Sequence, residues 1–135
     1  MADYLKPLPI PSPESVPFWK GAKEHKLKIQ KCNECNGTWF PPATICAHCG
    51  SRDHDWIEAC GEGNIHSFVT YHRIYHKGWE GELPYVIAII ELVEGARMLG
   101  NIVGIEVDEV VCDMQVKVMF DDVTAEVTIP KFQPA

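Results

Sequence analysis

The feature that most constrains this chain is a pair of Cys-x2-Cys motifs separated by ten residues. The four cysteines are Cys32, Cys35, Cys46 and Cys49. Each motif forms a tight turn, or knuckle, whose two thiolates point at one centre, and two knuckles together complete a tetrahedral metal site. Asn36 and Gly50 directly follow the two motifs and supply the turn residues that a knuckle needs. The spacing therefore predicts one metal ion held by four thiolates.

Four cysteine ligands indicate a structural metal. A catalytic zinc ion keeps an open position and usually has three protein ligands, whereas four thiolates close the shell. We expect structural zinc, whose binding free energy, on the order of 10 kcal/mol, folds a segment too small to fold alone. Iron in the same site is an alternative, because spacing does not separate the two metals. We expect His48, inside the second motif, to be a solvated side chain.

The rest of the chain favours metal binding over disulfides. It has no run of about 18 apolar residues, so we expect no membrane span. Its N-terminal stretch lacks a basic segment followed by an apolar one, so we expect no secretory signal and a cytoplasmic location, where disulfides are rare. We expect Cys60 and Cys112 to be buried and inert. An exposed thiol with a lowered pKa at either position would instead indicate an independent enzyme.

Composition and hydrophobic pattern divide the chain at residues 1–29, 30–60 and 61–135. The first segment starts with a proline-rich arm and continues as a helix that a serine caps and that runs to about His25. The second holds the cysteines, with short strands entering and leaving. From Gly61 apolar residues recur with a period of two, in five strands joined by short turns. We expect a mainly β fold: an N-terminal helix, a four-cysteine zinc ribbon and a C-terminal five-stranded OB-fold barrel.

Two details of the barrel can be predicted from the same pattern. Residues 85–95 form an almost continuous apolar run rich in β-branched residues, which is typical of a well-buried strand. In the strand before it, alternation places His66 and His72 on one face and Tyr71 on the other. We expect that face to be solvated.

The order of several short motifs is similar to that of a known family. The motifs are a helix with Phe18-Trp19, a ribbon with Pro41-Pro42 between its knuckles, CGS after the last ligand, a Trp, GEGNIHSF, LPYVIAIIEL, NIVG and a terminal Phe-x-Pro. From about residue 14 to its end the chain resembles small proteins that join a rubredoxin-like zinc ribbon to an OB-fold. That family was formerly catalogued as a domain of unknown function.

The resemblance implies an accessory role. Members of this family are non-catalytic subunits of acyl-CoA enzymes, and their partners include sterol-carrier-type thiolases, related aldolases and hydratases. The resemblance thus implies a hetero-oligomer with a thiolase-like subunit that carries out thiolytic or retro-aldol cleavage of a C–C bond in a CoA ester. It also implies that the CoA ester is a shared ligand. A subunit of an acyl-CoA hydratase complex is the alternative.

Charge opposes a nucleic-acid module, which is the other function that an OB-fold with a zinc ribbon suggests. Residues 61–135 carry five basic and twelve acidic side chains, whereas residues 1–60 carry seven of each. A protein that binds single strands needs a basic groove with stacking aromatic residues. An acidic barrel repels a phosphate backbone. We therefore expect no nucleic-acid partner.

Five residues are candidates for contact with CoA or with a partner. They are Lys20, Lys23, Lys26, Trp19 and Trp79. The lysines recur at helical spacing and suit the few phosphates of CoA, although a solvated helix face has the same pattern. Trp79 lies in a glycine-flanked loop, and tryptophan is enriched at binding hot spots. No phosphate loop, nucleophile elbow or dinucleotide fingerprint is present in the sequence, so we assign no catalytic residue.

Overall fold

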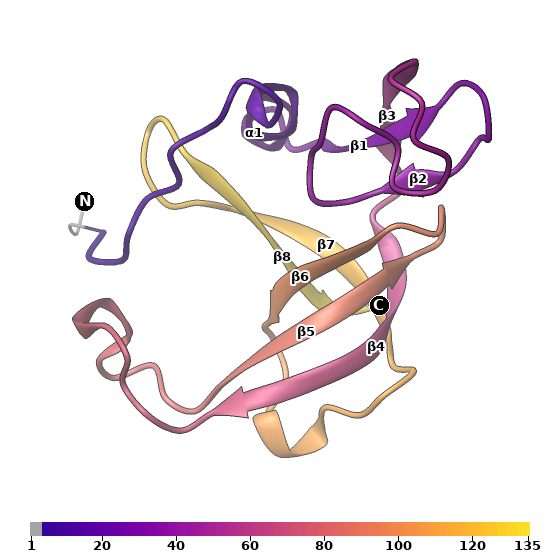
Figure 1. The fold of residues 1–135 in the computed structure, drawn as a ribbon. Coiled ribbons are helices and arrows are strands. Elements are labelled where there is room, and N and C mark those ends of the chain that lie inside the picture. Colours follow the sequence, from indigo (N-terminus) through magenta and orange to yellow (C-terminus); the bar gives the residue numbers. More distant parts are fainter. Residues whose placement is uncertain (1–3) are drawn as a thin grey trace.

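The computed structural model describes residues 4–135 and has one α-helix, a three-stranded sheet and a closed five-stranded barrel in these residues (Figure 1). The small sheet sits at one end of the barrel, and the helix lies beside it, near the connection between the last two strands (Figure 1). This is the mainly β architecture that the sequence predicts. No helix in the described residues is long and apolar enough to cross a membrane.

The helix α1 (Val16–Lys23) is shorter than predicted. Ser15 occupies the N-cap position, but its hydroxyl donates to the Ser12 carbonyl oxygen instead of capping the helix. The helix stops before His25, which adopts a left-handed φ of 61°. Lys20 and Lys23 lie in the last turn, where cations favour the helix dipole. Lys26 lies beyond the helix, so the expected helical spacing of three lysines is wrong for this residue.

The ribbon sheet has the order β2-β1-β3. Its central strand β1 (Leu27–Cys32) pairs antiparallel with β3 (His54–Ala59) along its whole length. The third strand, β2 (Thr38–Trp39), has only two residues and was not predicted. The strands β1 and β3 cover the predicted short strands on either side of the cysteines. They bring both knuckles to one end of the sheet.

The barrel closes in the strand order β4-β5-β6-β8-β7, with β7 pairing back onto β4. Its strands are β4 (Glu62–Tyr71), β5 (Tyr85–Leu92), β6 (Arg97–Ile102), β7 (Gln115–Asp122) and β8 (Thr128–Pro134). Short 3-10 helices, η1 (Lys77–Trp79) and η2 (Val107–Glu109), interrupt the longer connections. The strands β6 and β8 pair in parallel, with Ile102 opposite Phe132. This five-stranded closure is that of an OB-fold.

A tight turn at Gly95 and a close approach at Gly61 fix the ends of the barrel. Gly95 has a φ of 106° and donates its N–H to the Leu92 carbonyl, which confirms the predicted turn between β5 and β6. Gly61 has a φ of 84° and joins β3 to β4. A side chain at Gly61 would meet the Val118 side chain at 2.5 Å. Glycine at this position lets the chain pass from the ribbon into the barrel.

The helix, the ribbon and the barrel share one hydrophobic core. Phe18 of α1 and both Leu27 and Ile29 of β1 belong to the same buried cluster as the barrel residues Ile90 and Phe132. Complete burial of a side chain such as Phe132 stabilises the fold by about 2–3 kcal/mol. The boundaries predicted at 29/30 and 60/61 stay predictions, and the first three residues of the predicted arm lie outside the described residues.

Two predicted details of the barrel are wrong. The strand β4 ends at Tyr71, so His72 lies outside it, and a bulge between Ile65 and Ser67 displaces His66 from the regular alternation. The strand β5 is not buried on both faces. Its residues alternate between buried and half-buried, although nearly all of them are apolar. The outer face of β5 is therefore apolar and partly open.

Candidate metal centre and ligand surfaces

The two knuckles bring the four cysteine sulfur atoms together. All four Sγ atoms lie within 4.8 Å of one another. The Sγ atoms of Cys32 and Cys49 are 3.6 Å apart, as are those of Cys35 and Cys46. All four cysteines are free thiols in the structure. Cys32 and Cys46 are buried, whereas Cys35 and Cys49 are exposed, which places the cluster at the surface of the ribbon.

Backbone N–H groups surround the sulfur atoms. The N–H groups of Glu34 and Cys35 lie 3.4 and 3.5 Å from Cys32 Sγ. In the second knuckle, the N–H groups of His48 and Cys49 lie 3.3 and 3.4 Å from Cys46 Sγ. Such donors stabilise the thiolate form of cysteine, which is the form that binds a metal.

These hydrogen bonds favour ionised cysteines. Burial opposes ionisation of the Cys46 thiol, but the N–H groups of Cys49 and His48 outweigh it and lower the pKa of Cys46 to about 6. The pKa of Cys32 is also lowered, mainly by the N–H of Cys35. The pKa values of Cys35 and Cys49 are raised instead, that of Cys49 to about 12: a backbone N–H lowers each, but burial and the neighbouring sulfur atoms outweigh it. The cluster therefore favours ionisation at Cys32 and Cys46 over Cys35 and Cys49.

The donor set fits zinc. Four sulfur ligands at about 2.3 Å from a tetrahedral zinc ion lie about 3.8 Å apart, close to the two separations in this structure. The two left-handed residues that follow the knuckles, Asn36 at φ 62° and Gly50 at φ 80°, are the turn residues that the sequence predicts. Zinc held here would fix the two knuckles to each other. Four thiolates leave no position for a water molecule, so the centre is structural.

His48 does more than face solvent. Its Nε2 atom lies 2.8 Å from the carbonyl oxygen of Thr38, and its ring covers Gly37 closely enough that a side chain there would clash at 2.5 Å. The imidazole thus connects the second knuckle to β2. His48 is exposed, as expected, and its ring also contacts a backbone carbonyl oxygen that the sequence does not point to.

Cys60 and Cys112 are both exposed, and the expectation that they are buried is wrong. Each lies in a connection and not in the interior of a strand. The backbone N–H of Cys60 donates to the Glu94 carboxylate at 2.9 Å. Exposure meets one of the two conditions for a reactive thiol, and iodoacetamide labelling tests the other.

The five lysines between residues 20 and 31 fall into two groups in the fold. Lys28 and Lys31 lie on β1 directly opposite Glu58 and Asp55 of β3, so acidic residues oppose them. Lys20, Lys23 and Lys26 are exposed on and just after α1. Lys20 and Lys23 line one hollow of about 320 Å³ together with Trp19 and Glu126, but Lys26 is not in its lining.

The neighbouring aromatic residues of α1 differ in exposure. Phe18 is buried in the shared core and packs edge-to-face on Trp19, with ring centres 5.0 Å apart. Trp19 is half-buried, packs against the core and also faces the hollow of the lysines. Phe18 is therefore buried by its own chain, whereas part of the Trp19 side chain stays exposed.

Trp79 belongs to an aromatic cluster at the end of β4 and β5. Its ring stacks on Tyr85 at 6.0 Å, and Tyr85 stacks on Tyr71 at 5.1 Å. The cluster lines an open hollow of about 620 Å³, to which Tyr75 and His76 also contribute. Trp79 is half-buried, as its position in a glycine-flanked loop predicts.

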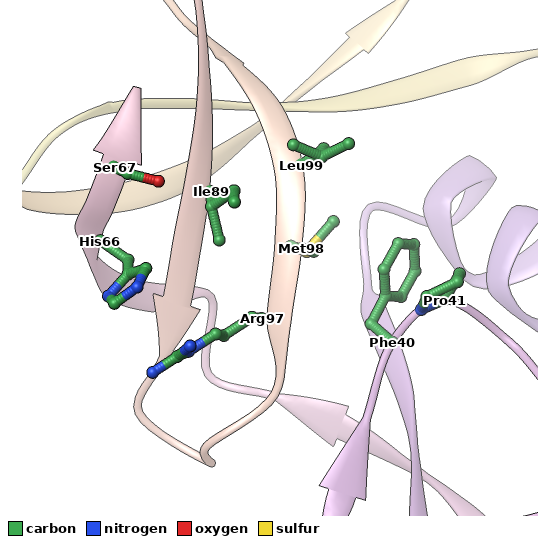
Figure 2. A pocket seen from close by; sticks show the side chains of 8 residues that line it. All are labelled: Phe40, Pro41, His66, Ser67, Ile89, Arg97, Met98 and Leu99. Atoms are coloured by element: carbon green, nitrogen blue, oxygen red, sulfur yellow. The ribbon is translucent and has the colours of Figure 1, made fainter. Parts of the chain in front are cut away.

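Sequence reasoning did not find a third hollow, at the ribbon end of the barrel. It measures about 410 Å³ and lies between Phe40-Pro41 and outer residues of β4, β5 and β6 (Figure 2). Its wall is mostly apolar and includes Ile89 and Leu99, with His66 and Arg97 at one edge. The Arg97 guanidinium lies 3.3 Å from the Glu91 carboxylate. The apolar outer positions of β5 were a sequence signal for this hollow.

Comparison with known proteins gives matches over both parts of the chain. A family model described as the ChsH2 rubredoxin-like zinc ribbon domain matches residues 19–55, and one described as the ChsH2 C-terminal OB-fold domain matches residues 56–121. A DUF35 domain-containing scaffold protein of Methanocaldococcus jannaschii is 36% identical over 107 residues, which cover 78% of this chain and 75% of that protein.

Of two further similar proteins, one is named as a subunit of a hydratase that acts on CoA esters and the other belongs to an aldolase. A probable enoyl-CoA hydratase alpha subunit of Thermomonospora curvata is 37% identical over 97% of this chain, which spans only 40% of that longer protein. A chain of the Ltp2-ChsH2(DUF35) aldolase structure superimposes with a TM-score of 0.84 and 36% identity, covering 94% of this chain and 98% of that one. Given these matches, the tetrathiolate ribbon and the five-stranded barrel, the chain belongs to the ChsH2/DUF35 family of zinc-ribbon and OB-fold proteins.

Proposed function

We propose that the chain is a non-catalytic subunit of a cytoplasmic acyl-CoA enzyme complex. Its partner is a thiolase-like subunit that cleaves a C–C bond of a CoA ester, by retro-aldol or thiolytic chemistry. The observation that carries the proposal is the likeness to a chain of the Ltp2-ChsH2(DUF35) aldolase, which extends over nearly the whole of both chains. In this role the chain stabilises the enzyme subunit and helps to bind CoA.

The metal centre supports an accessory role. Four thiolates around one zinc ion leave no open position at which water or substrate could be activated. When bound, the zinc ion supplies structural stability and no reaction step. Cys32, Cys35, Cys46 and Cys49 would hold it and thereby keep the ribbon packed on the barrel.

We further propose that the helix end contacts CoA. Lys20 and Lys23 lie beside Trp19 around one hollow, and Lys26 lies three residues beyond the end of the helix. Ammonium groups suit the diphosphate and ribose phosphate of CoA, and an indole offers a face for stacking. Glu126 lies in the same hollow and limits how much negative charge it attracts.

The experiment is purification of the tagged chain from its native host, followed by identification and assay of the subunit that accompanies it. We expect an acyl-CoA enzyme of the thiolase fold, active in cleavage only when both chains are present. Cleavage of a CoA ester by the small chain alone would refute the accessory role. A fully active thiolase-like enzyme that never associates with the chain would refute the partnership.

A hydratase complex is the second candidate. It is favoured by the 37% identity to the protein named a probable enoyl-CoA hydratase alpha subunit, which covers 97% of this chain. The purified complex separates the two candidates. A hydratase adds water to an enoyl-CoA and changes its absorbance without releasing a second carbon fragment, whereas cleavage releases two products.

A further inference from the structure

The strand β5 has the composition of a strand that is covered on both faces. Its inward residues Val86, Ala88, Ile90 and Leu92 are buried. Its outward residues Ile87 and Ile89 are apolar as well but only half-buried. Strands that are apolar on both sides are typical of sheets with cover on both faces, whereas a solvated face normally alternates with polar residues. The outer face of β5 therefore indicates a covering surface from another molecule.

The neighbouring strands extend this apolar surface. Val69 on β4 lies directly opposite Ile87, and Leu99 on β6 lies directly opposite Ile89. Val69 is 56% exposed and Leu99 is 65% exposed, which is unusual for aliphatic side chains in the middle of a sheet. One row further along, Tyr71 pairs with Tyr85. We call these six residues, Val69, Tyr71, Tyr85, Ile87, Ile89 and Leu99, the β4–β6 face.

The opposite side of the same barrel shows what a solvated face looks like in this protein. The outward residues of β7 include Gln115 and Lys117, both exposed and polar, while Val116 between them is buried. The apolar character of the β4–β6 face is therefore a property of that face and not of the barrel as a whole.

Both ends of the β4–β6 face are hollowed. At the ribbon end, Phe40 and Pro41 stand across from β6 and form the wall of the 410 Å³ hollow (Figure 2). At the other end, Tyr75 and Trp79 rise beside Tyr71 and Tyr85 around the 620 Å³ hollow. The face between them is largely apolar, with the polar Ser67 opposite Ile89 and Asn101 opposite Ile87, and its two hollows can receive protruding side chains of a partner.

Charge restricts what the partner can be. The barrel half of the chain is strongly acidic, yet Glu91, the carboxylate on the same side of β5 as Ile87 and Ile89, is paired with Arg97 at 3.3 Å and lies 4.0 Å from His66. No lysine lines either hollow in the described residues. An apolar centre with aromatic residues and one arginine at the rim is the composition of a protein interface. A nucleic-acid strand would need unpaired cations.

We propose that the β4–β6 face is the docking surface for an uncharged, apolar patch of the enzyme subunit. This inference rests on the proposed function and assigns the partner to one side of the barrel. The apolar centre supplies the buried area, and the two hollows fix the position of the partner.

Two matched variants test the surface. Val69 and Val111 are the same residue with nearly the same exposure, 56% and 55%, but Val111 lies between η2 and β7, outside the β4–β6 face. Val69→Glu should raise the Kd for the purified enzyme subunit by about tenfold or more, and Val111→Glu should change it less than about twofold. Zinc content and thermal unfolding of both variants check that the fold is kept, and Leu99→Ser replaces Val69→Glu if the latter does not fold.

The outcomes separate this inference from the proposed function. If the wild-type chain binds no acyl-CoA enzyme, both the proposed function and the docking surface are refuted. If the wild-type chain binds the enzyme and Val69→Glu or Leu99→Ser binds as tightly, only the β4–β6 face is refuted. Carbene footprinting of the wild-type complex gives an independent readout, in which labelling of Val69 and Leu99 should fall by about half or more. If their labelling falls instead because the free chain dimerises through this face, a second copy is the occupant and the inference is wrong.

Discussion

The ammonium nitrogen of Lys6 lies 5.2 Å from the centre of the Trp79 ring and 2.7 Å from a carboxylate oxygen of Glu82. This contact ties the N-terminal arm to the loop between β4 and β5. Gly78 allows the approach, because a side chain there would meet Lys6 and the Leu5 carbonyl at less than 3 Å. The Trp79 indole therefore contacts Lys6 of its own chain, and it also borders the aromatic hollow.

Trp79→Ala should weaken the complex with the enzyme subunit by more than about 1 kcal/mol, because a large aromatic anchor is lost beside the hollow. The measurement is the Kd by isothermal titration calorimetry. Lys6→Met is the control, since it removes the cation and keeps the indole. If both variants weaken binding equally, Trp79 acts only by holding the arm. If neither changes the Kd, Trp79 is no anchor.

The metal prediction concerns zinc stoichiometry. Purified protein should contain one zinc ion per chain, and Cys49→Ser should lower zinc affinity by at least about tenfold because it removes one thiolate of the tetrahedron. Competition with a chromogenic chelator measures this affinity. Cys60→Ser is the matched control, because Cys60 is also exposed but lies outside the cluster. Protein that holds neither zinc nor iron would contradict the assignment, and iron alone would correct its metal.

Much of the fold was predictable because its signals are local. The knuckles follow from Cys-x2-Cys spacing, and β1 and β3 have the residues that the hydrophobic pattern predicts. The barrel follows from five alternating segments with glycine at the turns. The predicted helix extends too far towards the C-terminus. The residue with left-handed backbone angles after the helix is His25, not a glycine, and sequence patterns rarely mark such positions.

The surfaces were less predictable because they depend on contacts between distant residues. A strand that is apolar on both sides is predicted to be buried on both faces. That the outer face of β5 is only half-buried becomes known only from the assembled barrel. His48 meets the Thr38 carbonyl across the ribbon, which spacing cannot indicate. Cys60 and Cys112 were expected inside because cysteine is usually buried, yet both lie in exposed connections.

The lysines of α1 give a prediction on CoA binding. Lys20→Glu combined with Lys23→Glu should weaken CoA binding by the complex and make it less sensitive to salt, because two cations facing the same hollow are reversed. Fluorescence titration at two ionic strengths measures both effects. Lys117→Glu, an exposed lysine on β7, is the control for net charge. Unchanged affinity and salt dependence would make the lysines a solvated helix face.

Asp122 gives a prediction on pH. The Thr128 hydroxyl donates to its carboxylate and the His25 ring lies 3.0 Å away, so the pKa of Asp122 is lowered in the fold. The unfolded pKa is about 3.9, so this stabilisation is fully present above about pH 5 and is lost as pH falls through the lower folded value. The stability difference between wild type and Asp122→Asn should therefore shrink from pH 5 to pH 2.5. Urea unfolding at both values measures it, and a constant difference would contradict the assignment.

In the proposed function, this chain assists an acyl-CoA enzyme without catalysing the reaction itself. The most direct measurement is turnover of a CoA ester by each purified chain alone and by the two mixed, with the mixture resolved by size-exclusion chromatography and light scattering. The account predicts that the small chain alone is inactive, that the two chains co-elute as a hetero-oligomer, and that full activity requires both. Turnover by the small chain alone, or full activity of the enzyme subunit without association, would contradict it.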